Sequence, residues 1–448
     1  MNIMGLIKTY QNTIFLILFT AFGALFASCG KSGASGELVG VGVKNFKSNE
    51  VPYGMVYIPS GTFVMGQTDQ DVTFGQLAQN KQASVSAFFM DETEITNSEY
   101  RQFVNWVRDS IAIIDYLQDD KYFIKSKTPS TAPGAKKLID WKKLGKGANV
   151  IWGNKKSGAA NAPKLQNIYY QGDDRVFDRN ELDVRLLKYN FAIMDLRGAA
   201  DNNKNKSKTR SDFIIRDNVA IYPDTLSWLS DFAYAQNEPM AQGYFVHPAY
   251  NNYPVVGVTW RQARAFTVWR TRYNDAYRES KKLPKRLPYQ LPSEAEFEYA
   301  ARGGRTGTTY PWGGPYPRNA KGCLMANFKP GRGNYADDGG AFTVNVKSYF
   351  PNDFGLYNIA GNVAEWTSSA FDESAPNFTN DLNPAFAYEA KDTDPDALKR
   401  KVVRGGSWKD IGYFLQNSAR TYEFQDEAKS FIGFRCVTPY IGRDIKDK

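Results

Sequence analysis

The clearest periodic pattern in the chain is an amphipathic helix that begins just after residue 95. Apolar side chains there recur at spacings of three, four and seven residues, which is the signature of one helical face. The residues on this face are Tyr100, Phe103, Val104 and Val107. Thr96 or Asn97 directly precedes the periodic run, and either residue type is a favoured N-cap. The pattern therefore predicts a helix that starts at this pair.

Two further helices are predicted from capping boxes. Thr259 stands three residues before Gln262, and Ser293 stands three residues before Glu296. In this arrangement each side chain satisfies a backbone N–H group of the other residue at a helix start. Apolar faces follow both caps, at Trp260, Ala263, Phe266 and Trp269 and at Phe297, Ala300 and Ala301. Gly303, after the third helix, is a typical C-cap.

Strand signals are short and separated by turns. Residues 54–66 alternate between apolar and polar positions around a Pro-Ser-Gly sequence, which predicts a β-hairpin. Beyond residue 304 the chain has short apolar runs broken by Gly, Pro, Asn and Asp, and it contains 37 Gly and 21 Pro in all. The expected fold class is therefore α+β, with little regular secondary structure for a chain of 448 residues.

The beginning of the chain resembles a bacterial lipoprotein signal. An apolar run at 14–27 follows Lys8, and it is shorter than the ~20 residues that a membrane-spanning helix needs. It ends in Phe26, Ala27 and Ser28 before Cys29, which resembles a lipobox with Phe26 in place of the usual leucine. We expect a signal peptide at 1–28, lipid attachment at Cys29 and a flexible tether over 29–50. Plain cleavage that releases a soluble product is the alternative.

Charge and histidine content restrict the chemistry. The net charge of +9 indicates either an acidic partner or anionic surface, or simply a solvated basic face. No nucleic-acid-binding module is present in the sequence, and export argues further against nucleic acid as a partner. The chain holds one histidine, His247, which excludes a metal site made of several histidines. We expect His247 to have a packed or hydrogen-bonded structural role.

Several phrases together resemble the formylglycine-generating (sulfatase-modifying) enzyme family. They occur in the family's order at residues 254–260, 291–304, 310–313, 355–366, 404–408 and 432–435. The resemblance implies a distant variant of the C-type-lectin fold over residues 51–440, followed by a polar tail at 441–448. The resemblance covers residues of about 53–107 and 253–437. We therefore expect the residues between them, about 108–252, to be an insertion, which is named the 108–252 segment. That segment is rich in lysine, asparagine and aromatic residues, and we expect it to fold onto the domain and bind partners.

The same resemblance indicates that the family's chemistry is absent. Catalytic members carry a copper-binding cysteine pair just after the Gly-Gly-Ser element, whereas this chain has Asp410 and Leu415 near those places. Neither side chain can replace a thiolate. Cys436 commonly pairs with a helix cysteine in the family, and that position is Thr267 here. We therefore expect a non-enzyme in which Cys436 is a buried free thiol, although a disulfide with Cys323 is the alternative in an exported domain.

The family also carries structural calcium, and two of its ligand phrases keep the required residue types. The candidate ligands are Asn327 and Asp338 in one site, and Asn358, Asn362 and Glu365 in the other. Carboxylate and amide oxygens suit this hard cation. The alternative is that Asn362 and Glu365 only satisfy buried backbone groups in a tight turn.

A second resemblance extends into the 108–252 segment. Residues 212–217, 222–225, 237–240, 312–316, 319–323 and 404–413 resemble the GldK/PorK family of gliding-motility lipoproteins. This implies a non-enzymatic lipoprotein at the periplasmic face of the outer membrane. It also implies a homo-oligomeric ring of the type IX secretion system, assembled with a GldN/PorN-like partner. The alternatives are a formylglycine-generating oxidase, which would need the cysteine pair, and a calcium-dependent glycan-binding module.

Overall fold

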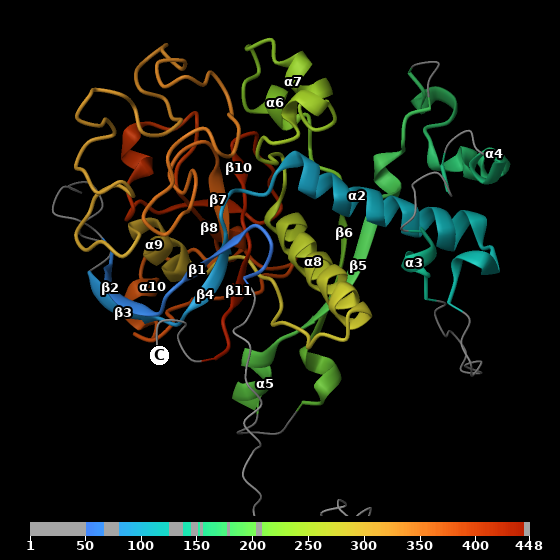
Figure 1. Cartoon of the computed structure of the whole chain (residues 1–448), viewed down its shortest axis with the longest axis horizontal. Coiled ribbons are helices and arrows are strands. Elements are labelled where there is room, and N and C mark those ends of the chain that lie inside the picture. Colours follow the sequence, from blue (N-terminus) through green and yellow to red (C-terminus); the bar gives the residue numbers. More distant parts are fainter. Residues whose placement is uncertain are drawn as a thin grey trace, which may run out of the picture. The chain divides into compact units, whose positions relative to one another are not determined.

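A computed structural model describes residues 51–66, 80–124, 138–144, 151–152, 156–176, 180–202 and 208–442 (Figure 1). The predicted signal peptide, Cys29, the tether and most of the polar tail lie outside these described residues. From Val51 onward the chain forms one compact unit. None of the helices in the described ranges combines the length and apolar character needed to cross a bilayer.

Two sheets, of three and four strands, form the centre of this unit. A three-stranded antiparallel sheet has the order β1 (Met55–Ile58), β4 (Phe88–Asp91), β11 (Val437–Pro439). A four-stranded sheet has the order β10 (Ile432–Gly433), β7 (Ala364–Ala370), β8 (Arg400–Arg404), β9 (Thr421–Phe424), with only β10 and β7 parallel. Two antiparallel pairs complete the set: β2 (Gly61–Met65) with β3 (Lys81–Val85), and β5 (Lys188–Met194) with β6 (Ile214–Ala220).

The predicted hairpin at 54–66 is wrong in its pairing, although both strands exist. β1 pairs with β4, whereas β2 pairs with β3. The backbone of β2 lies against helix α9 (Glu294–Arg302), since a Cβ atom added to Gly61 would stand 2.3 Å from the Tyr299 hydroxyl. All four residues of β4 are buried, so this apolar strand is the natural centre of a sheet. Alternation along a chain identifies a strand but does not identify its neighbour.

The three predicted helices are confirmed together with their caps. They are α2 (Asn97–Ile111), α8 (Trp260–Ser280) and α9 (Glu294–Arg302). Thr96, rather than Asn97, caps α2, and Glu99 completes a capping box that was not anticipated. The boxes at Thr259 and Ser293 form as expected. Gly303 ends α9 in the left-handed conformation with φ of 61°.

The largest hydrophobic core lies where α2 and α8 cross. Tyr100 of α2 stacks on Phe266 of α8 with ring centroids 5.6 Å apart, and Phe103 meets Trp269 at 5.2 Å. Tyr189 of β5 packs edge-on against Phe103 at 5.3 Å. Figure 1 shows α8 running beside β5 and β6. The expected packing of the 108–252 segment onto the domain is therefore confirmed for this pair of strands.

Most other elements are single turns. In and near the 108–252 segment they are the π-helix η1 (Ala112–Leu117), α3 (Trp141–Leu144), α4 (Lys156–Asn161), α5 (Leu196–Asn202), α6 (Ser227–Ser230) and α7 (Glu238–Gly243), and the 3-10 helices η2 (Asp120–Tyr122), η4 (Ala162–Ile168), η5 (Gly172–Asp174), η6 (Val184–Leu186), η7 (Arg210–Phe213) and η8 (Pro248–Tyr250). Nearer the C-terminus are α10 (Ala375–Phe378), η9 (Asp396–Lys399) and η10 (Gly412–Leu415). The predominance of short elements agrees with the glycine- and proline-rich sequence.

Candidate functional site

The loop after β8 carries the Gly-Gly-Ser element, just after which the resemblance places the catalytic cysteine pair. It turns through Gly405 and Gly406, whose φ angles are 90° and 69°. A Cβ atom on Gly406 would stand 2.8 Å from the Phe414 carbonyl oxygen, and one on Gly405 would stand 3.1 Å from that of Ile359. Both the left-handed conformation and the close backbone contacts require glycine. The Gly-Gly pair therefore fixes the direction in which Ser407 and the residues after it leave the strand.

Asp410, at the first expected cysteine position, is used to close this turn. One of its carboxylate oxygens, Oδ2, accepts hydrogen bonds from the Ser407 hydroxyl at 2.6 Å and the Ser407 backbone N–H at 3.0 Å. Burial raises the pKa of the Asp410 carboxyl above its usual value. Leu415 is fully buried in a separate apolar cluster with Tyr310 and Phe328. Neither residue offers a soft ligand for copper.

Trp408, two residues before Asp410, is covered by aromatic side chains from elsewhere in the chain. It stacks on Trp228 at 5.9 Å and contacts Phe232 at 5.2 Å and Phe342 at 5.4 Å. These four residues are named the Trp408 cluster. Trp228 and Phe232 belong to the 108–252 segment, and both tryptophans are only 2% exposed. The predicted insertion therefore fills the space beside the family's signature loop.

Hydrogen bonds from neighbouring residues hold the Trp408 cluster in position. Asp231, which lies next to Phe232, accepts hydrogen bonds from the Ser430 backbone N–H at 2.7 Å and the Ser430 hydroxyl at 2.9 Å. Trp408 donates its backbone N–H to the Asn362 carbonyl at 2.9 Å. The 108–252 segment is thus hydrogen-bonded to the strand region that precedes β10. No sequence motif had pointed to Trp228 as part of this site.

The remaining reactive residues are not assembled into a catalytic group. His247 is exposed, and its Nδ1 atom accepts a hydrogen bond from the Ala249 backbone N–H, so the expected structural role is confirmed as a hydrogen-bonded cap rather than a packed residue. Cys436 is fully buried and Cys323 is exposed, and both are free thiols. The predicted state of Cys436 is confirmed. Burial raises the pKa of the Cys436 thiol, and the nearby Asp91 carboxylate raises it further.

A buried ion pair lies under the signature loop. Arg435 donates from Nε and Nη2 to both carboxylate oxygens of Glu365, at distances of 2.6 to 3.0 Å. It also donates to the carbonyls of Asp91 at 3.2 Å and Tyr357 at 3.0 Å. The Arg435 and Glu365 side chains are at most 1% exposed. Asp91 in turn accepts two hydrogen bonds from Arg270 of α8.

Glu94 is the residue of this region that the sequence did not reveal. It is fully buried and accepts hydrogen bonds from the side-chain amides of Asn362 at 2.8 Å and Asn358 at 3.4 Å. Burial raises the pKa of Glu94 to about 8, because Arg435 offsets only part of the desolvation and Glu365 adds repulsion. Its position in an acidic Asp-Glu-Thr-Glu run resembles a solvated face, and nothing in the run indicates burial.

The first candidate calcium set has features that suit a hard cation. Asn327 donates its side-chain amide to the Phe342 carbonyl at 2.8 Å, and its buried Oδ1 atom has no hydrogen-bond partner among the described residues. A Cβ atom on Gly340 would lie 3.1 Å from that oxygen. Asp338 accepts backbone N–H groups from Phe328 at 2.6 Å and from Gly340 at 3.1 Å. These residues would supply the oxygens of a structural calcium ion, whose presence stays a prediction.

The second candidate set does not fit a cation in this arrangement. Glu365 is neutralised by Arg435, while Asn358 and Asn362 direct amide N–H groups at Glu94. Donor groups repel a metal ion, and a paired carboxylate gains little by binding one. Within the described residues, no group of three or more His, Cys, Asp or Glu side chains is placed to hold a metal. The alternative stated from the sequence, a tight turn with satisfied polar groups, describes this set better.

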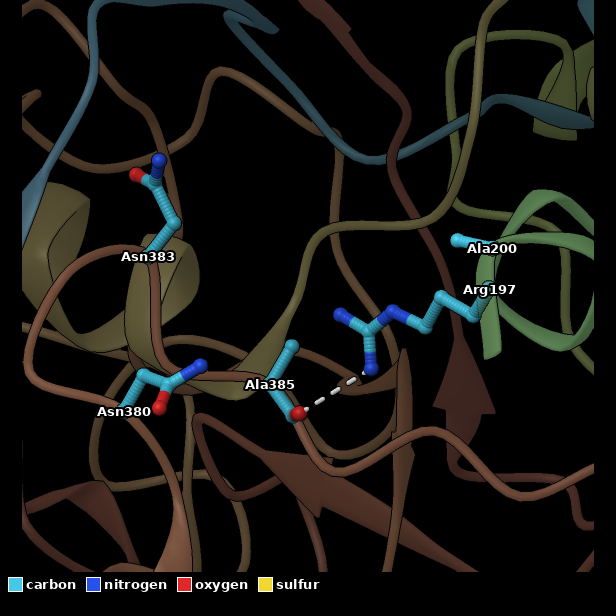
Figure 2. Close-up of a pocket in the computed structure, with 5 residues that line it drawn as sticks. All are labelled: Arg197, Ala200, Asn380, Asn383 and Ala385. Atoms are coloured by element: carbon cyan, nitrogen blue, oxygen red, sulfur yellow. Dashed lines mark hydrogen bonds between the residues drawn. The ribbon is translucent and has the colours of Figure 1, made fainter. Parts of the chain in front are cut away.

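A surface pocket of about 320 Å³ is lined by none of the residues described so far. It is lined by Arg197, Ala200, Asn380, Asn383 and Ala385. Figure 2 shows the Arg197 side chain extending from α5 toward the 380–385 loop, where it donates a hydrogen bond to the Ala385 carbonyl at 3.2 Å. Asn383 is engaged with the Ser86 backbone and hydroxyl. The pocket thus marks a contact between the 108–252 segment and the rest of the domain.

Comparison with known proteins shows the family to which this chain belongs. Residues 43–439 match the family model described as the sulfatase-modifying factor enzyme 1-like domain. The chain belongs to this family. Its mixed helix and sheet content is the family's fold, as the sequence phrases had led us to expect. The chain is similar to the inactive C-alpha-formylglycine-generating enzyme 2 of Bos taurus, with 32% identity over 192 residues that cover 42% of this chain and 50% of that protein.

Relatives that are named as formylglycine-generating enzymes have a similar sequence identity to this chain. The formylglycine-generating enzyme of Streptomyces coelicolor is 34% identical over 193 residues, which cover 42% of this chain and 52% of that protein. The formylglycine-generating enzyme of Bos taurus is 25% identical over 406 residues, 87% of this chain and 76% of that protein. The chain spans about half the length of the first two relatives. The family therefore contains proteins named as enzymes and proteins named as inactive. Membership alone does not tell whether this chain is catalytic, so the question turns on its own residues.

Removing the negative charge of Glu365 tests the buried ion pair. We expect Glu365→Gln to lower the free energy of unfolding by about 3–5 kcal/mol, because Arg435 is left buried without a counter-charge. Urea denaturation of the purified protein measures this change. Asp353→Asn is the matched control, since the Asp353 pair with Arg305 is half exposed and should contribute less than about 1 kcal/mol. Equal effects of the two substitutions would contradict the assigned role.

The raised pKa of Glu94 predicts a pH dependence of stability. The folded state holds a proton that the unfolded chain releases above the ordinary carboxyl value of 4.5. The stabilisation from Glu94 is therefore complete below that value and is lost as the pH rises through about 8. We expect Glu94→Gln to reduce the fall in the urea midpoint between about pH 5 and about pH 8.5. Glu279→Gln, at an exposed site on α8, should leave the fall unchanged, and an unchanged fall in Glu94→Gln as well would refute the assignment.

Proposed function

We propose that this chain is a non-enzymatic structural subunit of the periplasmic ring of the type IX secretion and gliding-motility machinery, of the GldK/PorK type. It is anchored in the outer membrane by lipid at Cys29 and assembles in many copies with a GldN/PorN-like partner. The family fold serves as a rigid block, and the 108–252 segment supplies contacts to other subunits. Repetition around a ring gives avidity, so each pairwise contact can be modest.

The observation that carries this proposal is the Trp408 cluster. In place of an open site beside the signature loop, Trp228 and Phe232 of the 108–252 segment cover Trp408. Asp410 closes the turn by hydrogen bonds to Ser407. A substrate cysteine would have to displace a stacked, buried tryptophan to reach this loop. Stacking and burial of such side chains stabilise a fixed shape, which is what a scaffold requires.

The placement of the two cysteines and of His247 within the described residues supports the same proposal. The two cysteines of the described domain are separated by more than a hundred residues, and Cys436 is fully buried. His247 is exposed and caps a 3-10 turn. These facts disfavour the oxidase alternative, since copper chemistry of that kind needs two nearby thiolates. The same facts neither favour nor disfavour a glycan-binding module, and no contact among the described residues supports that alternative.

The 108–252 segment also presents apolar side chains to solvent. Leu226 and Tyr234, which flank α6, are 63% and 102% exposed. Figure 1 shows α6 and α7 close together, in a part of the chain made of short helices. Large apolar and aromatic side chains in such a position favour a protein interface. We infer that α6 and its flanks contact a neighbouring ring subunit.

The test is isolation of the tagged, full-length protein from detergent-solubilised envelopes, with negative-stain imaging and mass spectrometry. We expect large rings that contain a second periplasmic protein in stoichiometric amount. The double substitution Leu226→Glu with Tyr234→Glu should reduce ring recovery. Tyr316→Glu with Phe350→Glu, at equally exposed positions outside the segment, is the matched control and should leave rings intact. Isolated monomers of the unmodified protein, with no stoichiometric partner, would sink the proposal.

A further inference from the structure

The end of α8 and the loop after it form an exposed basic surface with apolar side chains. Residues 272–287 contain six basic and two acidic side chains. Among them, Leu283 and Leu287 are 40% and 36% exposed, and Tyr273 and Tyr277 of α8 are 56% and 58% exposed. We name this surface the α8 ledge, defined by Tyr273, Tyr277, Lys281, Lys282, Leu283, Lys285 and Leu287. It lies outside the Trp408 cluster and outside both candidate calcium sets.

Hydrogen bonds hold the ledge in a defined shape. The Leu283 backbone N–H donates to the Arg278 carbonyl at 2.9 Å, and Arg278 Nε donates to the Pro284 carbonyl at 2.6 Å. The Thr438 hydroxyl of β11 donates to the Leu287 carbonyl at 3.0 Å. The loop is therefore folded back on α8 at one end and joined to the three-stranded sheet at the other. Its leucines are presented to solvent by a supported backbone.

The charges of the ledge are weakly compensated. Lys285 is the partner of Asp275, but the two side chains are 3.9 Å apart and Lys285 is 67% exposed. Neither Lys281 nor Lys282 is in an ion pair within the part of the chain that the structure describes. Tyr273 and Tyr277 are four residues apart and share one face of α8, and Lys281 follows as the C-cap of this helix. The result is a face on which lysines alternate with tyrosines and leucines.

We propose that the α8 ledge rests on the anionic lipid surface of the membrane to which the protein is anchored. This inference depends on the membrane anchoring proposed above. Leucine side chains gain by entering the lipid boundary, and tyrosines favour the level of the headgroups. Lysines beside them are attracted by anionic headgroups. A single surface that combines these three residue types suits a bilayer.

A bilayer fits this surface better than an acidic protein. The exposed leucines are separated in the sequence by Pro284, Lys285 and Arg286, so basic residues stand between them along the chain. Lysine is depleted at the centres of protein interfaces, where its hydrated charge is costly to bury. At a membrane, the long lysine stems can lie along the apolar boundary while the ammonium groups stay in water. The composition and spacing therefore favour lipid.

Such a contact would give the anchored subunit an orientation. The 22 residues from Cys29 to Glu50 can reach about 70 Å when extended, so the predicted tether alone does not determine which face meets the membrane. A second contact on the folded domain removes this freedom. All copies in a ring could then present the same surfaces to their neighbours.

The experiment places a reporter on the ledge of the natural, full-length lipidated protein. In a Cys323→Ser background, an environment-sensitive dye is attached at Leu283→Cys, with Tyr234→Cys on the flank of α6 as the position control. Cys436 is fully buried and should not react. The proteins are reconstituted on vesicles of phosphatidylglycerol and phosphatidylethanolamine that carry doxyl-labelled lipid, or on vesicles of phosphatidylcholine alone. We expect quenching of the dye at position 283 on the anionic vesicles, well above that at position 234.

Charge variants sharpen the result. Lys281→Glu, Lys282→Glu and Lys285→Glu together should reduce quenching at position 283 to the level of position 234, as should about 0.5 M salt, which screens surface charges. Lys164→Glu, Lys188→Glu and Lys321→Glu change the net charge equally at other exposed sites and should have no effect.

Three outcomes would overturn the inference. Low quenching at both positions while the protein stays on the vesicles would remove the ledge contact and leave the anchor in place. Shielding of position 283 only when the ring partner is added in detergent would assign the ledge to a protein. Failure of the lipidated protein to associate with either vesicle would overturn the proposed anchoring itself, and this inference with it.

Discussion

The buried pair of Arg435 and Glu365 is the contact on which the rest of the domain depends. Arg435 lies between β10 and β11, so its position links the four-stranded sheet to the three-stranded one. Its guanidinium reaches Glu365 on β7 and the carbonyl of Asp91 at the end of β4. An unpaired charge at such depth is strongly unfavourable, so the segments that supply its partners must come together in one arrangement. Two of the family phrases meet at this residue, because Arg435 belongs to 432–435 while its partners Glu365 and Tyr357 belong to 355–366.

The same architecture is compatible with the proposed loss of catalytic chemistry at the signature loop. Gly405 and Gly406 are required by the backbone path, and Trp408 is tied to the Asn362 turn by a backbone hydrogen bond. These constraints are independent of the residues at 410 and 415. Asp410 and Leu415 can therefore replace thiols while the loop keeps its shape, and Trp228 can cover it. Structural and catalytic demands on the loop are separable, and this chain meets the structural ones.

How much the sequence could predict differs between elements for physical reasons. Capping boxes and apolar faces are local, so the sequence predicts the starts of α2, α8 and α9 to within a residue, and Gly303 predicts the end of α9. The partner of β1 was not, because strand pairing depends on residues distant in the chain, and β4 offered a more buried neighbour than β2. Trp228 lies 180 residues before Trp408, and no local pattern records that contact. The role of Glu94 is not visible in the sequence, because its hydrogen-bond partners Asn358 and Asn362 lie more than 260 residues away along the chain.

The most direct test of the central claim, that this family fold is kept while its chemistry is lost, is a cysteine-conversion assay. The purified protein is incubated with copper(I), oxygen, an excess of a thiol reductant that supplies the remaining two electrons, and a cysteine-containing sulfatase peptide. The Streptomyces coelicolor enzyme serves as a positive control, and the peptide mass is followed. The account predicts that the control peptide is converted to the formylglycine form while the peptide given to this protein keeps its thiol. Conversion by this protein that withstands Cys323→Ser would contradict the account and show that the Trp408 cluster opens to admit chemistry.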